Sequence, residues 1–228
     1  ADPVPDAELA GWLDRLVAAG TPVLATSYCR DPVGIDEAYR RSAARGYLAF
    51  VAPGPACDAV PAHPAVPPGA HAGDVARLGD ARNYLQLLSP GSFADRGEYL
   101  ARLAATDHDV LVLDTCHDGV PLTASEVDGL RTKSGGGGRL VLAYLCIGAA
   151  ETHRDDWQQA WESEPPSWLE PADPDRPGHR PVAYWAPGWV GVVLGNPEAR
   201  LDRILAAGFD GVLLDRIDAY AYIDDSYG

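Results

Sequence analysis

Residues 109–114 have the sequence DVLVLD, and residues 209–215 have the similar sequence FDGVLLD. Each is an apolar run that ends in a carboxylate, and neither alternates apolar with polar side chains. Runs of this kind are typical of strands that are covered on both faces, as in a parallel sheet. Further apolar runs predict strands at residues 22–28, 47–51, 84–88, 139–145 and 182–185.

Helical patterns lie between these runs. Residues 6–20 place three leucines and a valine on one helical face and end in a glycine, which commonly closes a helix. Thr123 and Glu126 have the spacing of a capping box at the start of another helix. This capping box lies in the helical pattern at residues 122–130, and further helical patterns cover residues 35–46, 97–105, 154–161 and 197–207. Alternating strands and helices predict an α/β fold with a parallel sheet, either doubly wound or closed into a barrel.

Two segments interrupt the alternation. Residues 52–73 are rich in proline, which disfavours both helix and central strand, so we expect a linker there. Residues 135–138 are four consecutive glycines that precede a strand rather than a helix. A phosphate-binding glycine loop is followed by a helix, so the sequence argues against a nucleotide-dependent enzyme.

Charge and length restrict the partners and the number of domains. The 228 residues are 46% hydrophobic, which suits a single domain with a real core. The net charge of −15 repels nucleic acid and anionic lipid, so neutral or cationic partners are expected. No apolar stretch approaches the ~18 residues of a membrane-spanning helix, and we expect no membrane partner.

The cysteines leave the redox environment open. Cys29, Cys57, Cys116 and Cys146 show no C-x-x-C spacing, and the histidines show no metal-ligand spacing, so we expect no metal and no cofactor. An even count in a chain without methionine favours an oxidising compartment, in which Cys116 and Cys146 could pair. Buried free thiols are an equally good interpretation. A removed signal peptide or a trimmed chain would each explain the missing initial methionine.

Carboxylates follow several predicted strands. Asp114 and Asp215 end apolar runs, Asp218 follows shortly after, and Glu151 lies just past Gly148. Barrels and open α/β sheets place their active sites at the carboxyl ends of strands, so these residues predict a carboxylate-lined site. As structural alternatives, Asp114 would cap the turn that follows its strand, and Glu151 would stabilise the start of a helix.

Aromatic side chains occur near the same strand ends. Sugars stack their C–H faces on aromatic rings, which makes these residues candidates for a glycan groove. For any one of them, ordinary core packing is the simpler interpretation. Arg154 is a candidate for orienting a carboxylate, with a surface role as the alternative. The aromatic candidates are Tyr144, Tyr184, Trp185, Trp168 and Trp189.

A set of motifs in the second half resembles one enzyme family. Residues 147–151 form an Ile-Gly-x-x-Glu turn with Arg154 three residues later, and a Trp- and Pro-rich loop, a Tyr-Trp pair and FDGVLLDRIDAY at residues 209–220 follow in order. In this order the segment 138–222 resembles the extracellular polygalactosaminidases of glycoside hydrolase family 114. Residues 83–119 resemble that family's first two strands, which puts Asp114 at the family's strand-end aspartate. The resemblance implies a (β/α)8-type TIM barrel and a secreted, extracellular protein.

The chain departs from the family pattern in two ways. Ala149 stands where the family motif often has its first glutamate, so Glu151 alone remains to act as the acid. Residues 21–58 resemble the family's final strand, helix and closing segment, yet they come first. This order implies a circular permutation within one domain over residues 1–228, with 52–73 as the linker and residues 22–28 in the same sheet as 84–88. About six barrel strands are recognisable where about eight are standard, so either the barrel is incomplete or strands lie outside this chain.

The resemblance implies a glycoside hydrolase that cleaves α-1,4-linked galactosamine or N-acetylgalactosamine polysaccharide without a cofactor. Such enzymes need one carboxyl group to protonate the leaving oxygen and a second, ionised one to attack or to activate water. We assign these roles to Glu151 and Asp114, with Asp215 in reserve. The expected substrate-binding residues are Tyr144, Arg154, Tyr184, Trp185 and Asp218. The alternative is a catalytically inactive carbohydrate-binding or structural barrel.

Overall fold

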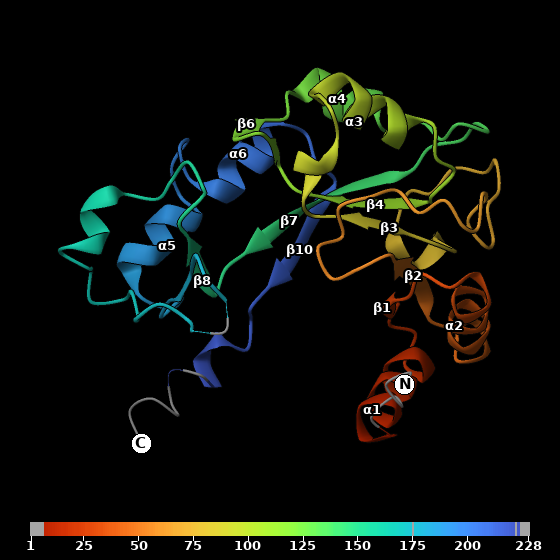
Figure 1. Cartoon of the computed structure of the whole chain (residues 1–228), viewed down its shortest axis with the longest axis horizontal. Helices are drawn as coiled ribbons and strands as arrows, with labels where there is room; N and C mark the ends of the chain where they lie inside the picture. Colours follow the sequence, from red (N-terminus) through yellow and green to blue (C-terminus); the bar gives the residue numbers. More distant parts are fainter. Residues whose placement is uncertain (1–6, 175, 222, 224–228) are drawn as a thin grey trace. The chain divides into compact units, whose positions relative to one another are not determined.

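The computed structural model describes residues 7–174, 176–221 and 223 (Figure 1). The chain divides into two compact units. The first comprises the residues up to 113 together with 129–141, and the second comprises 114–128 together with 142–228.

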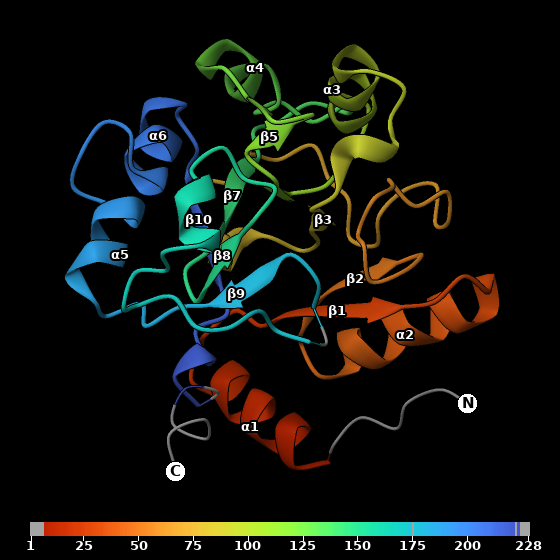
Figure 2. The same ribbon diagram turned by 60° about the vertical axis from the view of Figure 1, so that its left-hand side comes forward.

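The first unit begins with alternating helices and parallel strands. Helix α1 (Ala7–Ala18) is followed by β1 (Leu24–Tyr28), α2 (Pro32–Ala44) and β2 (Leu48–Ala52). Strands β1 and β2 pair in parallel, and α2 packs against β2 (Figure 2). The Asp31 side chain accepts the Gly34 N–H at 2.9 Å, and Pro32 occupies the first turn, which together fix the start of α2.

The rest of the first unit is built on a second parallel pair. Strand β3 (Leu85–Leu87) pairs with β4 (Val110–Leu113), and α3 (Arg96–Ala104) connects them. Short 3-10 turns, η1 (Leu78–Asp80) and η2 (Pro90–Ser92), flank β3. Figure 1 shows α3 over the β3–β4 pair, where it buries Tyr99 and Leu103.

The prediction that residues 22–28 share a sheet with 84–88 is wrong in its hydrogen bonding. Strands β1 and β2 form their own two-stranded sheet. The two pairs meet through side chains: the hydroxyl oxygens of Thr26 and Tyr84 lie 2.7 Å apart, and Tyr84 packs on Phe50. Just after β3, the N–H of Leu88 donates to the carbonyl of Cys57. A residue of the Pro-rich segment, and not of β1, therefore makes this backbone hydrogen bond.

The Pro-rich segment 52–73 contains no helix and, after Ala52, no strand, as its prolines require. It is nevertheless bound to its unit at several points. Asn83 Nδ2 donates to the carbonyl of Pro68 at 3.1 Å, and Lys133 Nζ donates to that of Gly73 at 2.7 Å. The segment therefore follows a defined path over the unit.

The second unit contains the parallel pair β7 (Leu140–Cys146) and β10 (Gly211–Asp215). The first two residues of β7 belong to the first unit. Helices α5 (Pro187–Val193) and α6 (Arg200–Ala206) pack together on one side of this pair (Figures 1 and 2).

Short elements complete the second unit. The antiparallel pairs are β5 (Cys116–His117) with β6 (Val120–Pro121), and β8 (Ala149–Glu151) with β9 (His179–Pro181). Helix α4 (Ala124–Gly129) begins with the predicted capping box, in which Thr123 N–H donates to Glu126 and Glu126 N–H donates to Thr123 Oγ1. A 3-10 turn, η3 (Gln159–Glu162), lies between β8 and β9.

Two predicted elements differ in the structure. Residues 182–185 were expected to be a strand, but the extended segment is β9, which ends at Pro181, and Ala186 N–H closes a turn onto Ala183. Pro187 then starts α5. Residues 154–161 were expected to be helical, but only the 3-10 turn η3 forms there. The charged side chains at 154–156 are engaged in ion pairs outside the segment.

The predicted α/β class is confirmed, since parallel strands connected by helices occur in both units. No ring of hydrogen-bonded strands closes within the described residues, which agrees with the prediction of an incomplete barrel. Among the same residues, no helix combines the length and apolar character that a membrane crossing requires.

Replacing Gly148 by alanine is expected to lower the free energy of unfolding by about 1 to 3 kcal/mol. A Cβ at this position would overlap the carbonyl oxygen of Arg216 and lie 2.7 Å from Ala219 Cβ, so β8 or the end of β10 must shift. Urea unfolding followed by circular dichroism measures the loss. Gly191→Ala in α5 is the control, because its Cβ would meet nothing within 4 Å; equal midpoints for the two variants would contradict the packing argument.

Candidate functional site

Arg154 binds two carboxylates at once. Its Nε lies 3.0 Å from Glu151 Oε2, and its Nη1 lies 2.8 Å from Asp114 Oδ1. Glu151 is the last residue of β8, and Asp114 follows β4 directly. Because neighbouring nitrogens of one guanidinium hold both groups, the two carboxylates lie close together.

The three charged side chains are largely removed from water. Asp114 and Glu151 are 9% and 5% exposed, and Arg154 is 15% exposed. Burial opposes the charge of Arg154, but the hydrogen bond and the charge of Asp114, together with Glu151, raise the pKa of the guanidinium above its ordinary value. Arg154 is therefore a permanent cation between the two carboxylates.

Asp114 has a second partner. Its Oδ1 also accepts the Cys116 N–H at 2.9 Å, which caps the turn that leads into β5. The turn-capping role considered as the structural alternative for Asp114 is thus real, and the same carboxylate also binds Arg154. The two roles coexist because one oxygen accepts from both donors.

Tyr144 and Asp215 form a second pair. The Tyr144 hydroxyl donates to Asp215 Oδ2 at 2.6 Å, across the parallel pairing of β7 and β10. Burial, reinforced by neighbouring negative groups that include Asp215 and Glu151, raises the pKa of Tyr144 well above its ordinary value. Tyr144 is therefore a fixed hydroxyl donor to a carboxylate.

A pocket open to solvent, with a volume of about 590 Å³, lies beside these groups. Tyr144, Glu151 and Arg154 line it, together with Cys116 and Cys146. Its wall carries a carboxylate, a hydroxyl and a guanidinium. Glu151 is the carboxylate of the Arg154 cluster that reaches this space.

The other predicted binding residues lie elsewhere in the second unit. The rings of Tyr184 and Trp185 stack edge to face with centroids 5.2 Å apart, and the Tyr184 hydroxyl donates to the carbonyl of Ile217. Trp185 is 53% exposed, and Asp218 is exposed as well. Among the hydrogen bonds of the described residues, none joins Tyr184, Trp185 or Asp218 to Arg154.

Core packing is the correct interpretation for Trp168 and Trp189. Trp189 is fully buried, and its indole N–H donates to the carbonyl of Ile147 at 2.7 Å. Successive ring contacts with centroids 5.0 to 5.3 Å apart connect Trp157, Trp161, Trp168 and Trp189. Trp168 and Trp189 therefore pack in the core instead of presenting a sugar-binding face.

Sequence reasoning missed His179 and Arg200. His179 stands directly opposite Glu151 in the β8–β9 pair, with Nδ1 3.9 Å from Glu151 Oε1. Arg200 lines the same pocket. Neither residue carries a local signal in the sequence, since each reaches the site through a long-range pairing. The described residues contain no group of three or more His, Cys, Asp or Glu side chains that could hold a metal ion.

All four cysteines are free thiols, so the pairing considered for Cys116 and Cys146 is not formed. Burial, helped by the charges of Glu151 and Asp215, raises the pKa of Cys146 to about 12, and burial also raises the pKa of Cys57 and of Cys116. Thiolates are the reactive form, so these thiols are protected from thiol reagents.

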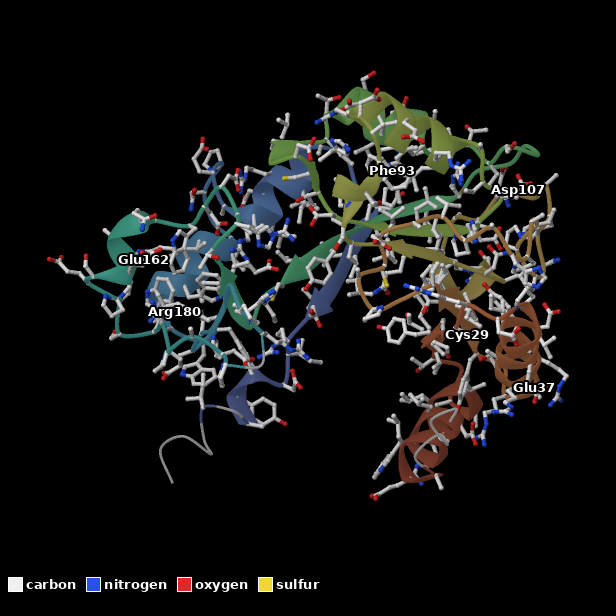
Figure 3. The ribbon with its side chains drawn as sticks, viewed as in Figure 1. Cys29, Glu37, Phe93, Asp107, Glu162 and Arg180 are labelled. Carbon is white, nitrogen blue, oxygen red and sulfur yellow. The ribbon has the colours of Figure 1, made fainter. Side chains whose placement is uncertain are left out.

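A disulfide reagent at about pH 8 is therefore expected to label Cys29 first and Cys146 only after unfolding. Cys29, labelled in Figure 3, is partly exposed, whereas Cys146 is buried. Mass spectrometry of digested protein at successive times gives the order. Cys29→Ser should remove the fast phase, and early labelling of Cys146 in the folded protein would contradict the expected protection.

Comparisons with a family model and with known proteins each match part of the chain. The family model described as Glycoside-hydrolase family GH114 matches residues 93–228. An uncharacterized protein of Deinococcus radiodurans is 46% identical over 111 residues, and one of Methanocaldococcus jannaschii is 32% identical over 123 residues. These matches cover 49% and 53% of this chain but 33% of each relative, so the chain spans about a third of the length of these relatives.

Two solved structures are similar to parts of the chain. The Ega3–galactosamine complex of Aspergillus fumigatus is 24% identical with a TM-score of 0.37, covering 50% of this chain and 39% of that one. The glycoside hydrolase domain of PelA from Pseudomonas aeruginosa is 19% identical with a TM-score of 0.40, covering 67% and 47%. The family model covers more than half of the chain, including every residue of the Arg154 cluster. This chain belongs to glycoside hydrolase family 114.

Proposed function

We propose that this chain hydrolyses α-1,4-linked galactosamine or N-acetylgalactosamine polysaccharide, using Glu151 and Asp114. The observation that supports this most is the pair of buried carboxylates on one guanidinium, beside a pocket that Glu151 lines. The charge of −15 favours a substrate with free amino groups, which are cationic. The motifs at residues 147–154 and 209–220 support the same substrate class.

In this mechanism Glu151 protonates the leaving oxygen. Its Oε2 accepts the Arg154 Nε–H, so the transferable proton must be carried on Oε1, the oxygen that faces His179. Glu151 lines the pocket and can reach a bound sugar. A carboxyl group can accept at one oxygen and donate from the other, so the hydrogen bond from Arg154 does not occupy the oxygen that would carry the proton.

Asp114 is the ionised partner, which attacks the anomeric carbon or activates water. The Arg154 guanidinium and the Cys116 N–H both donate to its Oδ1, which leaves this carboxylate with two donors. Asp215 is the reserve for this role, since Tyr144 donates to it in the same unit. Tyr144 and Arg154 are the pocket residues that would bind the substrate hydroxyl groups.

Substrate contacts beyond the pocket are assigned to Tyr184, Trp185 and Asp218. The half-exposed Trp185 ring suits stacking against the C–H face of a sugar, and Tyr184 braces that ring from the side. Asp218 is exposed and could pair with an amino group of the polymer.

The arrangement of the chain is also proposed, as a single circularly permuted domain of a secreted protein. The β1–α2–β2 unit is supported by its parallel pairing, and the bound path of residues 52–73 is what a junction between the permuted segments requires.

The alternative is an inactive carbohydrate-binding barrel. Ala149, which is buried in β8 where the family motif often has a glutamate, favours this alternative. With alanine at position 149, Glu151 is the one acidic residue of β8.

The test is incubation of the full chain with α-1,4-linked galactosamine oligosaccharides and, separately, with a β-1,4-linked glucosamine polymer. We expect new reducing ends and shorter oligosaccharides, seen by mass spectrometry, with the first substrate alone. Binding without cleavage would support the inactive barrel. If the chain neither binds nor cleaves the galactosamine oligosaccharides, the proposed substrate class is wrong. Cleavage of the glucosamine polymer would overturn the linkage assignment.

A further inference from the structure

The segment that follows Glu151 is an irregular turn with few backbone bonds of its own. Arg154 N–H donates to the carbonyl of Glu151 at 3.0 Å, and Trp157 N–H donates to that of Arg154 at 3.1 Å. No helix continues through residues 152–158. The position of the Arg154 side chain therefore depends on what holds this turn from outside.

Two arginines of α6 hold the turn through adjacent aspartates. Arg200 Nε lies 2.7 Å from Asp156 Oδ2, and Arg203 donates to Asp155. Consecutive side chains of the turn thus point to different partners, with Arg154 directed to the carboxylates and the two aspartates directed to α6. A chain fixed on both sides in this way has little freedom to rotate.

The Arg200–Asp156 pair is more buried than the Arg203–Asp155 pair. The Arg200 side chain is 10% exposed and that of Asp156 is 14% exposed, whereas the Arg203 pair is 33% and 38% exposed. Charge-assisted hydrogen bonds that are shielded from water exceed exposed ones in strength. The exposed pair is accordingly expected to contribute less to the order of the turn.

Arg200 also ties the turn to the strand that carries Tyr144. Its Nη1 donates to the carbonyl of Cys146, the last residue of β7, at 3.0 Å, and its guanidinium lies over the buried Trp189 ring with 4.9 Å to the centroid. Trp189 in turn donates to the carbonyl of Ile147. One guanidinium therefore connects the end of β7, helix α5 and the turn behind Glu151.

We infer that Arg200 is a positioning residue of this site. By fixing Asp156 against the end of β7, it holds the Arg154 guanidinium at the place where it binds Glu151 and Asp114. Arg200 acts through Asp156 and Arg154. The consequence for catalysis rests on the proposed function, whereas the consequence for the order of the turn does not.

The first experiment measures order and needs no substrate. In Arg200→Gln, amide hydrogen exchange in a peptide spanning residues 152–157 should accelerate by about 10-fold or more, the equivalent of one lost hydrogen bond to a charged group. Arg203→Gln should accelerate it less. Arg40→Gln, which breaks an exposed pair with Glu37 in the first unit, is the control and should leave the peptide unchanged. Exchange in Arg200→Gln equal to that of the control would overturn the inference.

The second experiment asks whether Arg200 acts through Asp156. Arg200→Gln and Asp156→Asn should each lower kcat, by up to about 10²-fold for a misplacement near 1 Å, with a smaller change in KM. The double variant should be no worse than the more affected single variant, and Arg200→Lys should recover part of the rate. Additive losses, or a fall in folded fraction with an unchanged kcat per folded molecule, would assign Arg200 a structural role only. If the wild-type chain cleaves nothing, the proposed function fails while the exchange result still decides the inference.

Discussion

Glu151→Gln is expected to lower kcat by about 10²- to 10⁴-fold, the usual contribution of a general acid, while leaving the fold intact. Glutamine keeps the shape of the side chain, and its oxygen can still accept the Arg154 Nε–H. What it loses is the proton that Glu151 would donate from Oε1. Release of reducing ends from α-1,4-linked galactosamine oligosaccharides measures the rate, and circular dichroism reports the fold.

Glu162→Gln is the matched control for this variant. Glu162 is an exposed glutamate on η3, labelled in Figure 3, and the same charge is removed without touching Arg154. Its rate should match that of the wild-type chain. A Glu151→Gln variant as fast as this control would exclude Glu151 from the chemistry.

The partner carboxylate is identified by comparing two asparagine variants. Asp114→Asn should cost at least as much rate as Glu151→Gln, and its amide oxygen can still accept from Cys116 and Arg154, which preserves the turn. Asp215→Asn should cost less. The reverse order would transfer the ionised role to Asp215, whose carboxylate accepts from Tyr144.

Much of the fold could be predicted because its determinants are local. The apolar runs at residues 109–114 and 209–215 became β4 and β10, since a strand covered on both faces needs no alternation. Capping chemistry placed the start of α4 equally well, as Thr123 and Glu126 show. Strand-end position, together with the family resemblance, indicated Asp114 and Glu151.

The remaining features depend on contacts between segments distant in sequence. The β8–β9 pair, which brings His179 opposite Glu151, joins residues whose local sequence has no strand signal strong enough to predict it. Arg200 reaches Asp156 across 44 positions of the chain. At residues 154–161 the local helical pattern was not followed either, and the side chains at 155 and 156 are engaged in long-range ion pairs.

The aromatic residues show the limit of composition as a guide to function. Trp189 and Trp185 are four positions apart, yet one is fully buried and the other is 53% exposed. Pro187, which starts α5 between them, turns the chain so that Trp189 enters the core. A sequence pattern marks both as candidates for sugar stacking, and burial decides between them.

A buried ion pair between Lys133 and Asp109 stabilises the first unit. Lys133 Nζ lies 2.9 Å from Asp109 Oδ1, and both side chains are 0% exposed. The other oxygen of Asp109 accepts the Arg82 N–H at 2.8 Å, and the Lys133 ammonium also donates to the carbonyl of Gly73. The pair therefore joins the Pro-rich segment to the start of β4, which makes it part of the proposed junction.

Lys133→Met is expected to lower the free energy of unfolding by about 3 to 5 kcal/mol, because it leaves the Asp109 carboxylate buried without its cation. The loss belongs to the uncompensated charge more than to the pair, so Asp109→Asn/Lys133→Met should recover a substantial part of it. Urea unfolding of the two variants and the wild-type chain measures both changes. Arg77→Gln, which removes an exposed cation beside Asp80, is the control and should change stability by about 1 kcal/mol or less. If the double variant is as unstable as Lys133→Met alone, the lysine stabilises the unit through its hydrogen bond to Gly73. The stability of the unit would then depend on the path of the Pro-rich segment and not on the charge of Asp109.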